Sequence, residues 1–259
     1  MANWNDNRST QQGFGASPSQ TGDVAGRTTF DAGLRKHMLS IYNYMASGVL
    51  LTGIVALLTA RSGLAIQFAQ GPLMWLVALS PLAIVFAMSF GRDKFSTPTL
   101  QALYWGFAVL MGLSLSTIFL VYTGASIALT FFATAGAFAG LSLWGYTTQK
   151  DISGWGSFLI MGVVGLIIAT LLNAFLIGSP GLELAISALG VLIFAGLTAY
   201  DTQRLKQEYL YIQQLKMSNP SVAAAFPVSK MVVMGALSLY LDFINMFLFL
   251  LRFMGAARE

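Results

Sequence analysis

Long stretches without a charged residue divide this chain into segments of membrane-spanning length. Met38 to Ala60 is 23 residues without a charge, Ser62 to Gly91 is 30, and Phe95 to Gln149 is 55. A helix that crosses a bilayer needs about 20 apolar residues, so the longest run must fold back, and residues 122–126 offer a glycine-containing turn. The pattern predicts seven membrane-spanning helices, at residues 38–60, 73–91, 99–122, 126–147, 155–178, 182–204 and 229–252.

The composition indicates the same class of protein. Hydrophobic residues make up 56% of the chain and charged residues 9%, whereas soluble domains carry about 25% charged residues. So few charges cannot keep the surface of a soluble domain of this size hydrated, so the apolar surface must face lipid. The fold class is therefore an all-α integral membrane protein, with the bilayer as its first partner. A soluble enzyme and a nucleic-acid-binding protein are excluded.

Several kinds of chemistry are absent from the sequence. There is no cysteine, and His37 is the only histidine, which excludes a cysteine nucleophile, a thiolate metal site and a multi-histidine metal centre. The sequence contains neither a GxxxxGK[ST] phosphate-binding loop nor a GxSxG nucleophile motif. We therefore expect no cofactor and no enzymatic activity.

The N-terminal segment differs from the rest of the chain. Residues 1–30 are dominated by Asn, Ser, Thr, Gln and Gly, and they lack the apolar run and cleavage site of a signal peptide. Such a segment cannot bury enough apolar surface to offset the entropy of ordering. We predict a disordered polar tail at residues 1–30 and one seven-helix transmembrane domain at residues 31–259.

The basic residues predict an orientation. Loops on the cytoplasmic side of a membrane carry an excess of Lys and Arg, and eleven basic residues fall on one side of the predicted spans against three on the other. This bias favours a cytoplasmic N-terminus and an outer C-terminus, although a six-helix arrangement with a re-entrant last helix stays open. The cytoplasmic set is Arg8, Arg27, Arg35, Lys36, Arg92, Lys94, Lys150, Arg204, Lys206, Lys216 and Lys230, and the outer set is Arg61, Arg252 and Arg258.

Two acidic residues lie within the predicted apolar helices. Asp242 is about thirteen residues into the last helix, near the bilayer middle, and Asp201 ends the uncharged part of the sixth. An ionisable residue in the membrane costs about 2.5–3.5 kcal/mol on insertion scales and indicates a functional site. The two helices are consecutive and antiparallel, so the carboxylates could meet, although their depths differ by about two turns.

The chemistry of such a pair follows from its charge. Two carboxylates held close together in a low dielectric cannot both ionise easily, so they share a proton. Their oxygens also suit a hard cation such as calcium, for which protons would then compete. We therefore predict a calcium and proton site at Asp201 and Asp242. In a structural alternative, Asp201 caps its helix and Asp242 bonds to a neighbour such as Asn245.

Arg92, directly after the second predicted helix, is the candidate partner for gating. If Arg92 pairs with deprotonated Asp201, the pair would close the cytoplasmic end, and protonation of Asp201 would release it. We therefore predict tighter calcium binding at alkaline pH but a greater leak at mildly acidic pH. The alternative is an arginine that only extends to lipid headgroups.

Two motifs resemble a known family. The last predicted helix reads Ala236-Leu-Ser-Leu-Tyr-Leu-Asp-Phe-Ile-Asn-Met-Phe-Leu-Phe-Leu-Leu-Arg252, and the sixth contains Gly196-Leu-Thr-Ala-Tyr-Asp-Thr-Gln203. Both resemble the corresponding motifs of the Bax inhibitor family, the transmembrane Bax-inhibitor-motif proteins, and the hydropathy pattern agrees over residues 30 to 255. The polar N-terminal extension resembles that of bacterial members, which implies the bacterial inner membrane.

The resemblance implies a fold and a function. The fold is seven helices with the seventh in the centre, wrapped by the other six. The function is a pH-sensitive calcium leak in which the aspartates at positions 201 and 242 form the sensor and Arg92 is the counterpart of the arginine that pairs with the first of them. One position departs from the pattern: some members carry a glutamate eleven residues before that arginine, where this chain has Pro81.

Two other functions are considered. The family suggests that some bacterial members are non-conducting regulators that bind a membrane-anchored quality-control protease. Intramembrane aspartyl proteases also place catalytic aspartates on helices six and seven, one of them in a Tyr-Asp pair such as Tyr200-Asp201. Their second aspartate follows a Gly-x-Gly sequence, whereas here Leu239-Tyr240-Leu241 precedes Asp242 and no later Pro-Ala-Leu occurs.

Overall fold

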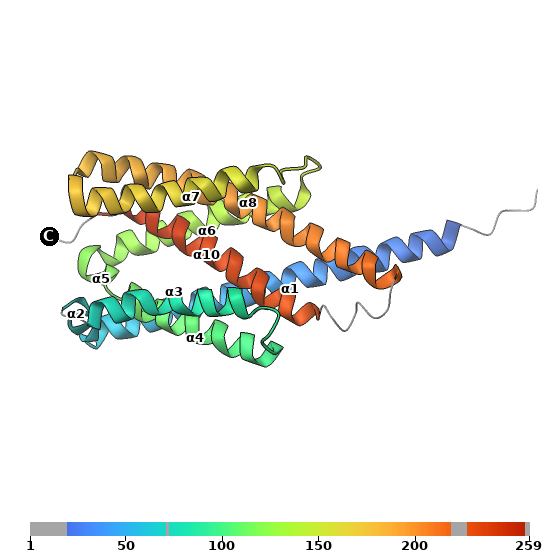
Figure 1. The fold of residues 1–259 in the computed structure, drawn as a ribbon, viewed down its shortest axis with the longest axis horizontal. Helices are drawn as coiled ribbons and strands as arrows, with labels where there is room; N and C mark the ends of the chain where they lie inside the picture. The colour runs from blue at the N-terminus through green and yellow to red at the C-terminus, as the bar shows by residue number, and fades with distance from the viewer. Residues whose placement is uncertain (1–19, 71–72, 219–226, 257–259) are drawn as a thin grey trace, which may run out of the picture.

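A computed structural model describes residues 20–70, 73–218 and 227–256, with side chains from residue 32 onward. Within these ranges every regular element is a helix (Figure 1). The elements are α1 (Gln20–Arg61), α2 (Leu64–Ala69), α3 (Leu73–Gly91), α4 (Thr97–Leu115), α5 (Ile118–Val121), α6 (Gly124–Thr147), α7 (Trp155–Leu172), the π-helix η1 (Asn173–Ile177), α8 (Pro180–Ser218) and α10 (Val228–Met254).

Seven helical segments among the described residues are long and apolar enough to cross a membrane, which confirms the predicted number of spans. The third span combines α4 with α5, and the fifth combines α7 with η1. The break in the third span falls at Ser116 and Thr117, whose hydroxyls donate to the carbonyls of Leu113 and Ser114. Such local bonds compete with the helical ladder, which explains why one continuous helix at 99–122 is not formed.

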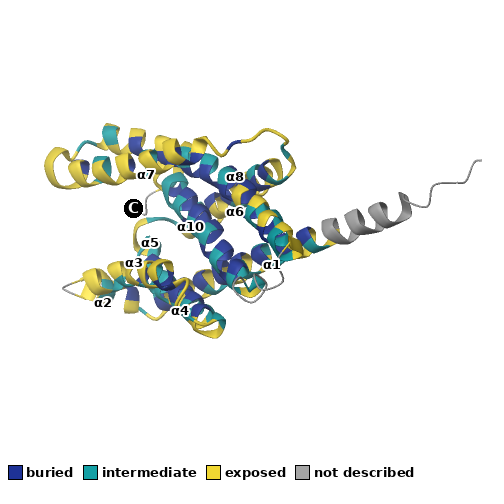
Figure 2. Ribbon diagram, turned by 45° about the vertical axis from the view of Figure 1, so that its right-hand side comes forward, coloured by how far each residue is buried: buried dark blue, intermediate teal, exposed yellow. Residues whose placement is uncertain are grey.

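Helix α10 lies at the centre of the bundle, as the family resemblance implies. It packs against α1, α4, α6 and α8. In the most apolar 18 residues of α10, 67% of the residues are buried. The corresponding buried share is 39% or less in every other span. Figure 2 shows the same contrast, because α10 is mostly buried while α3 and α7 are mostly exposed. The aspartate at position 242 is therefore carried by the most buried helix.

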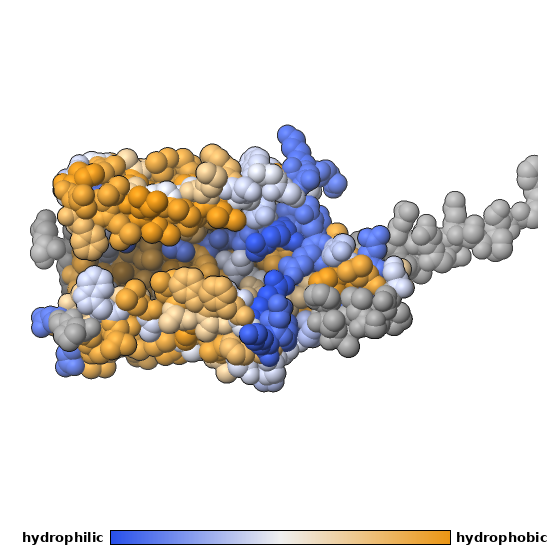
Figure 3. Space-filling view, viewed as in Figure 1, coloured by the Kyte–Doolittle hydropathy of each residue, from blue (hydrophilic) through white to orange (hydrophobic). Residues whose placement is uncertain are grey.

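The outer surface of the bundle is apolar. Phe158, Met161, Phe175 and Leu176 are each more than 70% exposed. Figure 3 shows apolar residues covering one end of this face and polar residues gathered toward the other. An exposed apolar surface of this extent requires lipid around it. The bundle is therefore built for a bilayer, and its polar end lies at or beyond the headgroups.

Two helices continue beyond their predicted ends. Helix α8 extends to Ser218, fourteen residues past the predicted end at 204. Helix α1 begins at Gln20, so residues 20–30, which we expected in the disordered tail, are helical. Once a membrane span has nucleated a helix, each further residue adds a hydrogen bond at little cost, so polar flanks can continue it. The tail prediction for residues 1–19 falls outside the described residues.

The N-terminal end of α1 and the C-terminal end of α10 lie at opposite ends of the bundle, as an odd number of crossings requires (Figure 1). The predicted orientation, with the N-terminus in the cytoplasm, stays a prediction, since the fold is the same in either direction.

Two hydrogen bonds in the core join three helices. Thr52 of α1 donates to the Ala108 carbonyl of α4 over 2.8 Å, and its oxygen lies 2.7 Å from the hydroxyl of Tyr240 on α10. Because the only hydroxyl proton of Thr52 goes to Ala108, Tyr240 donates to Thr52. Tyr240 is fully buried, so its hydroxyl has no access to water.

We expect Thr52→Val to lower the free energy of unfolding by about 1–3 kcal/mol, because it leaves the Tyr240 hydroxyl buried without a partner. Thermal unfolding in detergent measures the loss. Adding Tyr240→Phe removes the unpaired hydroxyl and should recover most of it. A single variant as stable as the natural protein would contradict this role of the bond.

Candidate functional site

Asp201 lies in the interface between α8 and α10. The Ser238 hydroxyl of α10 donates a hydrogen bond to Asp201 Oδ2. Arg204, three residues further along α8, places Nη2 3.3 Å from Asp201 Oδ1 and also donates to Ser238 Oγ over 3.1 Å. We call these three side chains the Asp201 network. They join α8 to α10 through one carboxylate.

Asp242 lies one turn after Ser238 on the same helix. Its side chain is buried, and its Oδ2 has no hydrogen-bond partner among the described residues. Ser238, which binds Asp201, is four residues before Asp242 on α10, so it relates the positions of the two aspartates. Four residues correspond to about 6 Å along a helix, so the two aspartates are offset by about one turn rather than the predicted two. The two aspartates therefore lie on the packed helices α8 and α10 about one turn apart, and their joint role stays a prediction.

Neither structural role considered for these aspartates is found. Asp201 lies well inside α8, which continues to Ser218, so it does not cap the helix. The Asn245 amide donates to the Leu241 carbonyl over 2.8 Å and not to Asp242. Oδ2 of Asp242 is thus a buried polar atom without a hydrogen-bond partner among the described residues.

Buried hydroxyls lie on α6 and on α8 at positions close to Asp201 in the sequence of α8. The Ser142 and Thr202 hydroxyls are 3.1 Å apart, and Thr198 donates to the Phe194 carbonyl one turn back. Across the described part of the chain, no group of three or more Asp, Glu or His side chains is placed to hold a metal ion. A cation at this level would have two carboxylates, with hydroxyl, carbonyl or water oxygens for the remaining positions.

The segment between α6 and α7 is attached to α8 just beyond the aspartate. Gln203 accepts a hydrogen bond from the Ile152 backbone over 2.9 Å and donates to the Lys150 carbonyl over 2.8 Å. In the same segment Asp151 is exposed and accepts hydrogen bonds from the hydroxyl and backbone of Ser153. These bonds hold the pKa of the Asp151 carboxyl below its usual value.

The predicted pair of Arg92 and Asp201 is wrong. Arg92 binds Glu208, with Nη2 2.6 Å from Oε1, while Asp201 pairs with Arg204. Glu208 lies two turns beyond Asp201 on the extension of α8, about 10 Å along the helix, which brings it beside the end of α3. The Arg92–Glu208 pair is partly exposed, so solvent and salt weaken it.

The only histidine lies at the same end of the bundle. His37 is buried and stacks on Tyr209 with the ring centres 4.5 Å apart, next to Glu208. Its Nδ1 has no partner among the described residues. This end, which also carries the Arg92–Glu208 pair, is called the basic end below.

Sequence reasoning missed Arg204, Ser238 and Glu208. Arg204 follows Asp201 at the i+3 spacing of helical ion pairs, and Ser238 precedes Asp242 at the i−4 spacing that shares a face. Both spacings were available in the sequence. Glu208 gave no such signal, because its role depends on how far α8 continues.

Comparisons with known proteins agree with the family resemblance. Residues 34–259 match the family model Bax1-I, described as inhibitor of apoptosis-promoting Bax1. The inner membrane protein YbhL of Escherichia coli is 42% identical over 229 residues, which cover 88% of this chain and 94% of that protein. A Caulobacter vibrioides protein described as uncharacterized is 48% identical over 239 residues, covering 88% of this chain and 92% of that one. The protein RP147 of Rickettsia prowazekii is 45% identical over 235 residues, covering 89% and 94%.

Proposed function

This chain belongs to the Bax inhibitor family, and on that premise we propose that it is a pH-sensitive calcium leak channel of the bacterial inner membrane. Its multi-pass membrane location rests on the seven spans and on the inner-membrane relative. In the proposal Asp201 and Asp242 form the site where protons and calcium compete. The protein needs no cofactor, and calcium is its cargo.

The observation that carries the proposal is the buried, unpartnered Oδ2 of Asp242, one helical turn along α10 from the Ser238 that binds Asp201. An isolated buried charge is costly, so this carboxylate needs a proton or a cation. A shared proton neutralises one of the two charges, and a divalent cation neutralises both. A central helix whose only role is packing would be more stable with an apolar residue at this position.

The number of ligands favours a transported ion over a permanently bound one. Calcium takes six to eight oxygens in tight sites, and here only two carboxylates converge within the described residues. An ion that passes through must bind well enough to enter and weakly enough to leave. Two carboxylates with nearby hydroxyls meet that requirement.

The Asp201 network supplies the proposed gate, with Arg204 in the place that the sequence assigned to Arg92. Deprotonated Asp201 attracts Arg204 and accepts from Ser238, which holds α8 against α10. Protonation releases Arg204 and makes Asp201 a neutral, weaker acceptor for Ser238, which loosens the contact between α8 and α10. Calcium therefore binds more tightly at alkaline pH, where fewer protons compete, while the gate opens at mildly acidic pH. In this proposal the N-terminus and the basic end face the cytoplasm.

The other two functions have weaker support. A non-conducting regulator of a membrane-anchored protease needs no unsatisfied carboxylate in its core. A protease would need access for a substrate backbone at Asp242, but the preceding Leu239 and Tyr240 are fully buried in packing. We retain the regulator as the alternative that flux measurements decide.

Calcium flux into liposomes containing the purified protein tests the proposal and the identity of the gating arginine together. The natural protein should leak calcium faster at pH 6 than at pH 8, values on either side of neutrality. Arg204→Gln should raise the flux at pH 8 by about tenfold, because a charged hydrogen bond contributes about 1.5–3 kcal/mol. Arg92→Gln is the matched control and should leave the pH response unchanged.

Two results would overturn the proposal. If the protein passes no calcium at either pH while remaining folded, the regulator becomes the better account. If Arg92→Gln alters the pH response and Arg204→Gln does not, the gate lies at the partly exposed ion pair and not in the Asp201 network.

A further inference from the structure

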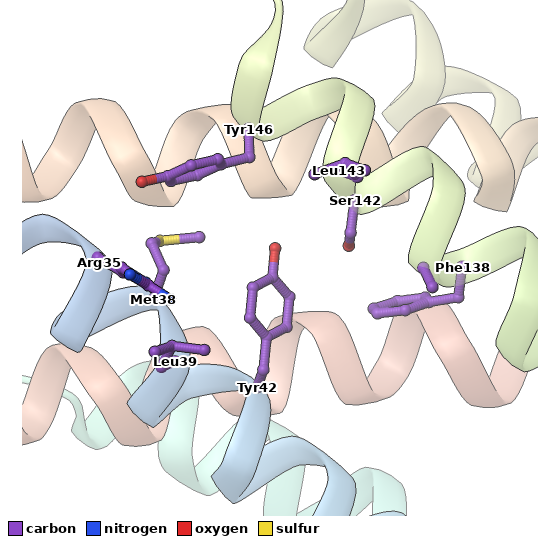
Figure 4. A pocket seen from close by; sticks show the side chains of 9 residues that line it. Arg35, Met38, Leu39, Tyr42, Phe138, Ser142, Leu143 and Tyr146 are labelled. Atoms are coloured by element: carbon purple, nitrogen blue, oxygen red, sulfur yellow. The ribbon is translucent and has the colours of Figure 1, made fainter.

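A groove lies between α1 and α6 at the basic end, apart from the aspartate pair. These two helices both pack on α8 and α10 but scarcely contact one another. The cavity between them has a volume of about 530 Å³. Its lining includes Arg35, Leu39 and Tyr42 from α1 and Phe138, Leu143 and Tyr146 from α6 (Figure 4). Leu39 and Leu143 are half or more exposed, so the groove opens to the surface of the bundle.

Polarity changes along the groove. Arg35 and Tyr146 lie at its outer end, and Tyr42 and Phe138 lie about two turns further in, at 1.5 Å per residue on antiparallel helices. In Figure 4 the Tyr42 hydroxyl points across the groove toward α6, while the Tyr146 hydroxyl points toward the end that carries Arg35. The groove thus runs from a cation, past hydroxyls, to an apolar inner end.

Positive charge at the mouth has no counterion within the described residues. Arg35 is exposed and makes no ion pair there. Lys206 of α8 donates to the Tyr146 carbonyl over 2.7 Å and lies 5.2 Å from the centre of the Tyr146 ring. Arg35 thus lies in the lining of the groove, and a second cation from another helix, Lys206, contacts Tyr146 of the same lining.

We propose that this groove binds one anionic phospholipid taken from the surrounding leaflet. The phosphate binds Arg35, with Lys206 adding charge, because a guanidinium is suited to phosphate oxygens. The hydroxyls of Tyr42 and Tyr146, which have no partner among the described residues, face the ester groups. One acyl chain lies along Leu39, Leu143 and Phe138.

A lipid is the occupant that both the positive charge of the groove and its depth in the membrane favour. An arginine at the polar end of a membrane span lies at headgroup level, and anionic headgroups attract such a residue. The floor is fixed: Phe138 packs edge-on against Phe243 of α10, with ring centres 5.6 Å apart, and Ser142 is bonded to α8. A fixed floor lets the groove select its occupant by shape as well as by charge.

Lipid retention by the purified full chain tests the proposal. The protein is titrated in neutral detergent with phosphatidylglycerol or with phosphatidylcholine of the same acyl chains, and bound lipid is counted by native mass spectrometry. We expect phosphatidylglycerol to be retained in preference. Arg35→Gln should weaken its binding about tenfold, the worth of one charged hydrogen bond, and should leave the weaker phosphatidylcholine binding unchanged. Arg35→Lys should keep most of the preference.

The control is Lys36→Gln, which removes the same charge from the next residue, an exposed one outside the groove lining. It should bind phosphatidylglycerol like the natural protein. Ala139 of α6 also lines the groove, so Ala139→Phe fills it and should reduce the binding of both lipids, with an unchanged elution profile in size-exclusion chromatography. Inorganic phosphate alone should not raise the unfolding temperature.

Three outcomes would overturn the assignment. Equal retention of the two lipids by the natural protein would remove the role of charge. Equal loss in Lys36→Gln and Arg35→Gln would make the effect one of net charge and not of the groove. Stabilisation by inorganic phosphate equal to that by phosphatidylglycerol would indicate a free-anion site.

Discussion

Replacing Asp201 by asparagine should raise calcium leak at alkaline pH about tenfold, up to the level that the natural protein reaches at acidic pH, and should flatten the pH response. Asparagine resembles the protonated carboxyl, so it releases Arg204 and offers Ser238 a neutral acceptor, whose hydrogen bond is weaker than that of a carboxylate. The interface between α8 and α10 is thereby loosened at every pH. Calcium flux into liposomes across a pH series measures the effect.

Asp151→Asn is the matched control, since it removes an acidic charge from the segment attached to α8 near Asp201. Its pKa is held below the usual value by the Ser153 bonds, so Asp151 stays ionised throughout the series and contributes no titration. The control should therefore keep the natural pH response. A flat response in both variants, or a natural response in both, would show that Asp201 is not the sensor.

Asp242→Asn should weaken calcium binding by on the order of a thousandfold, since a unit charge at about 4 Å contributes about 4 kcal/mol at an effective dielectric constant near 20. The same variant should be at least as stable as the natural protein without calcium. The reason is that Asp242 Oδ2 is buried without a partner, and removing its charge removes a cost of burial.

Calcium titration and thermal unfolding in detergent check the two parts of this expectation. Asn245→Ala is the control, because the Asn245 amide is already satisfied by Leu241 within α10. It should bind calcium normally. If Asp242→Asn unfolds at a clearly lower temperature and keeps its calcium affinity, Asp242 is a structural residue.

The membrane spans could be predicted from the sequence because a bilayer requires uncharged runs of a certain length. Such runs can be counted along the chain. It also located Asp201 and Asp242, since acidic residues in such runs are costly wherever the helices pack. The central position of α10 came only from the family resemblance. Nothing in the apolar pattern of that helix states how many neighbours surround it.

The wrong predictions depend on how far α8 extends and on how α8 packs against α10. No local sequence pattern contains either quantity. The partner of Arg92 depends on how far α8 continues past the membrane, and Glu208 reaches it only because the helix extends to Ser218. The one-turn offset of the aspartates depends on how α8 and α10 slide against each other, which the Ser238 bond fixes. Register between helices is a property of packing and not of periodicity.

The central claim is that the aspartates at positions 201 and 242 form one site for which protons and calcium compete, and proton release on calcium binding tests it most directly. Adding calcium to the weakly buffered protein at mildly acidic pH should release up to about one proton per chain, because a bound cation requires both carboxylates deprotonated. The release should shrink as the pH rises and should be absent from Asp201→Asn and Asp242→Asn. Calcium binding without proton release, or a release that survives in both variants, would contradict the claim.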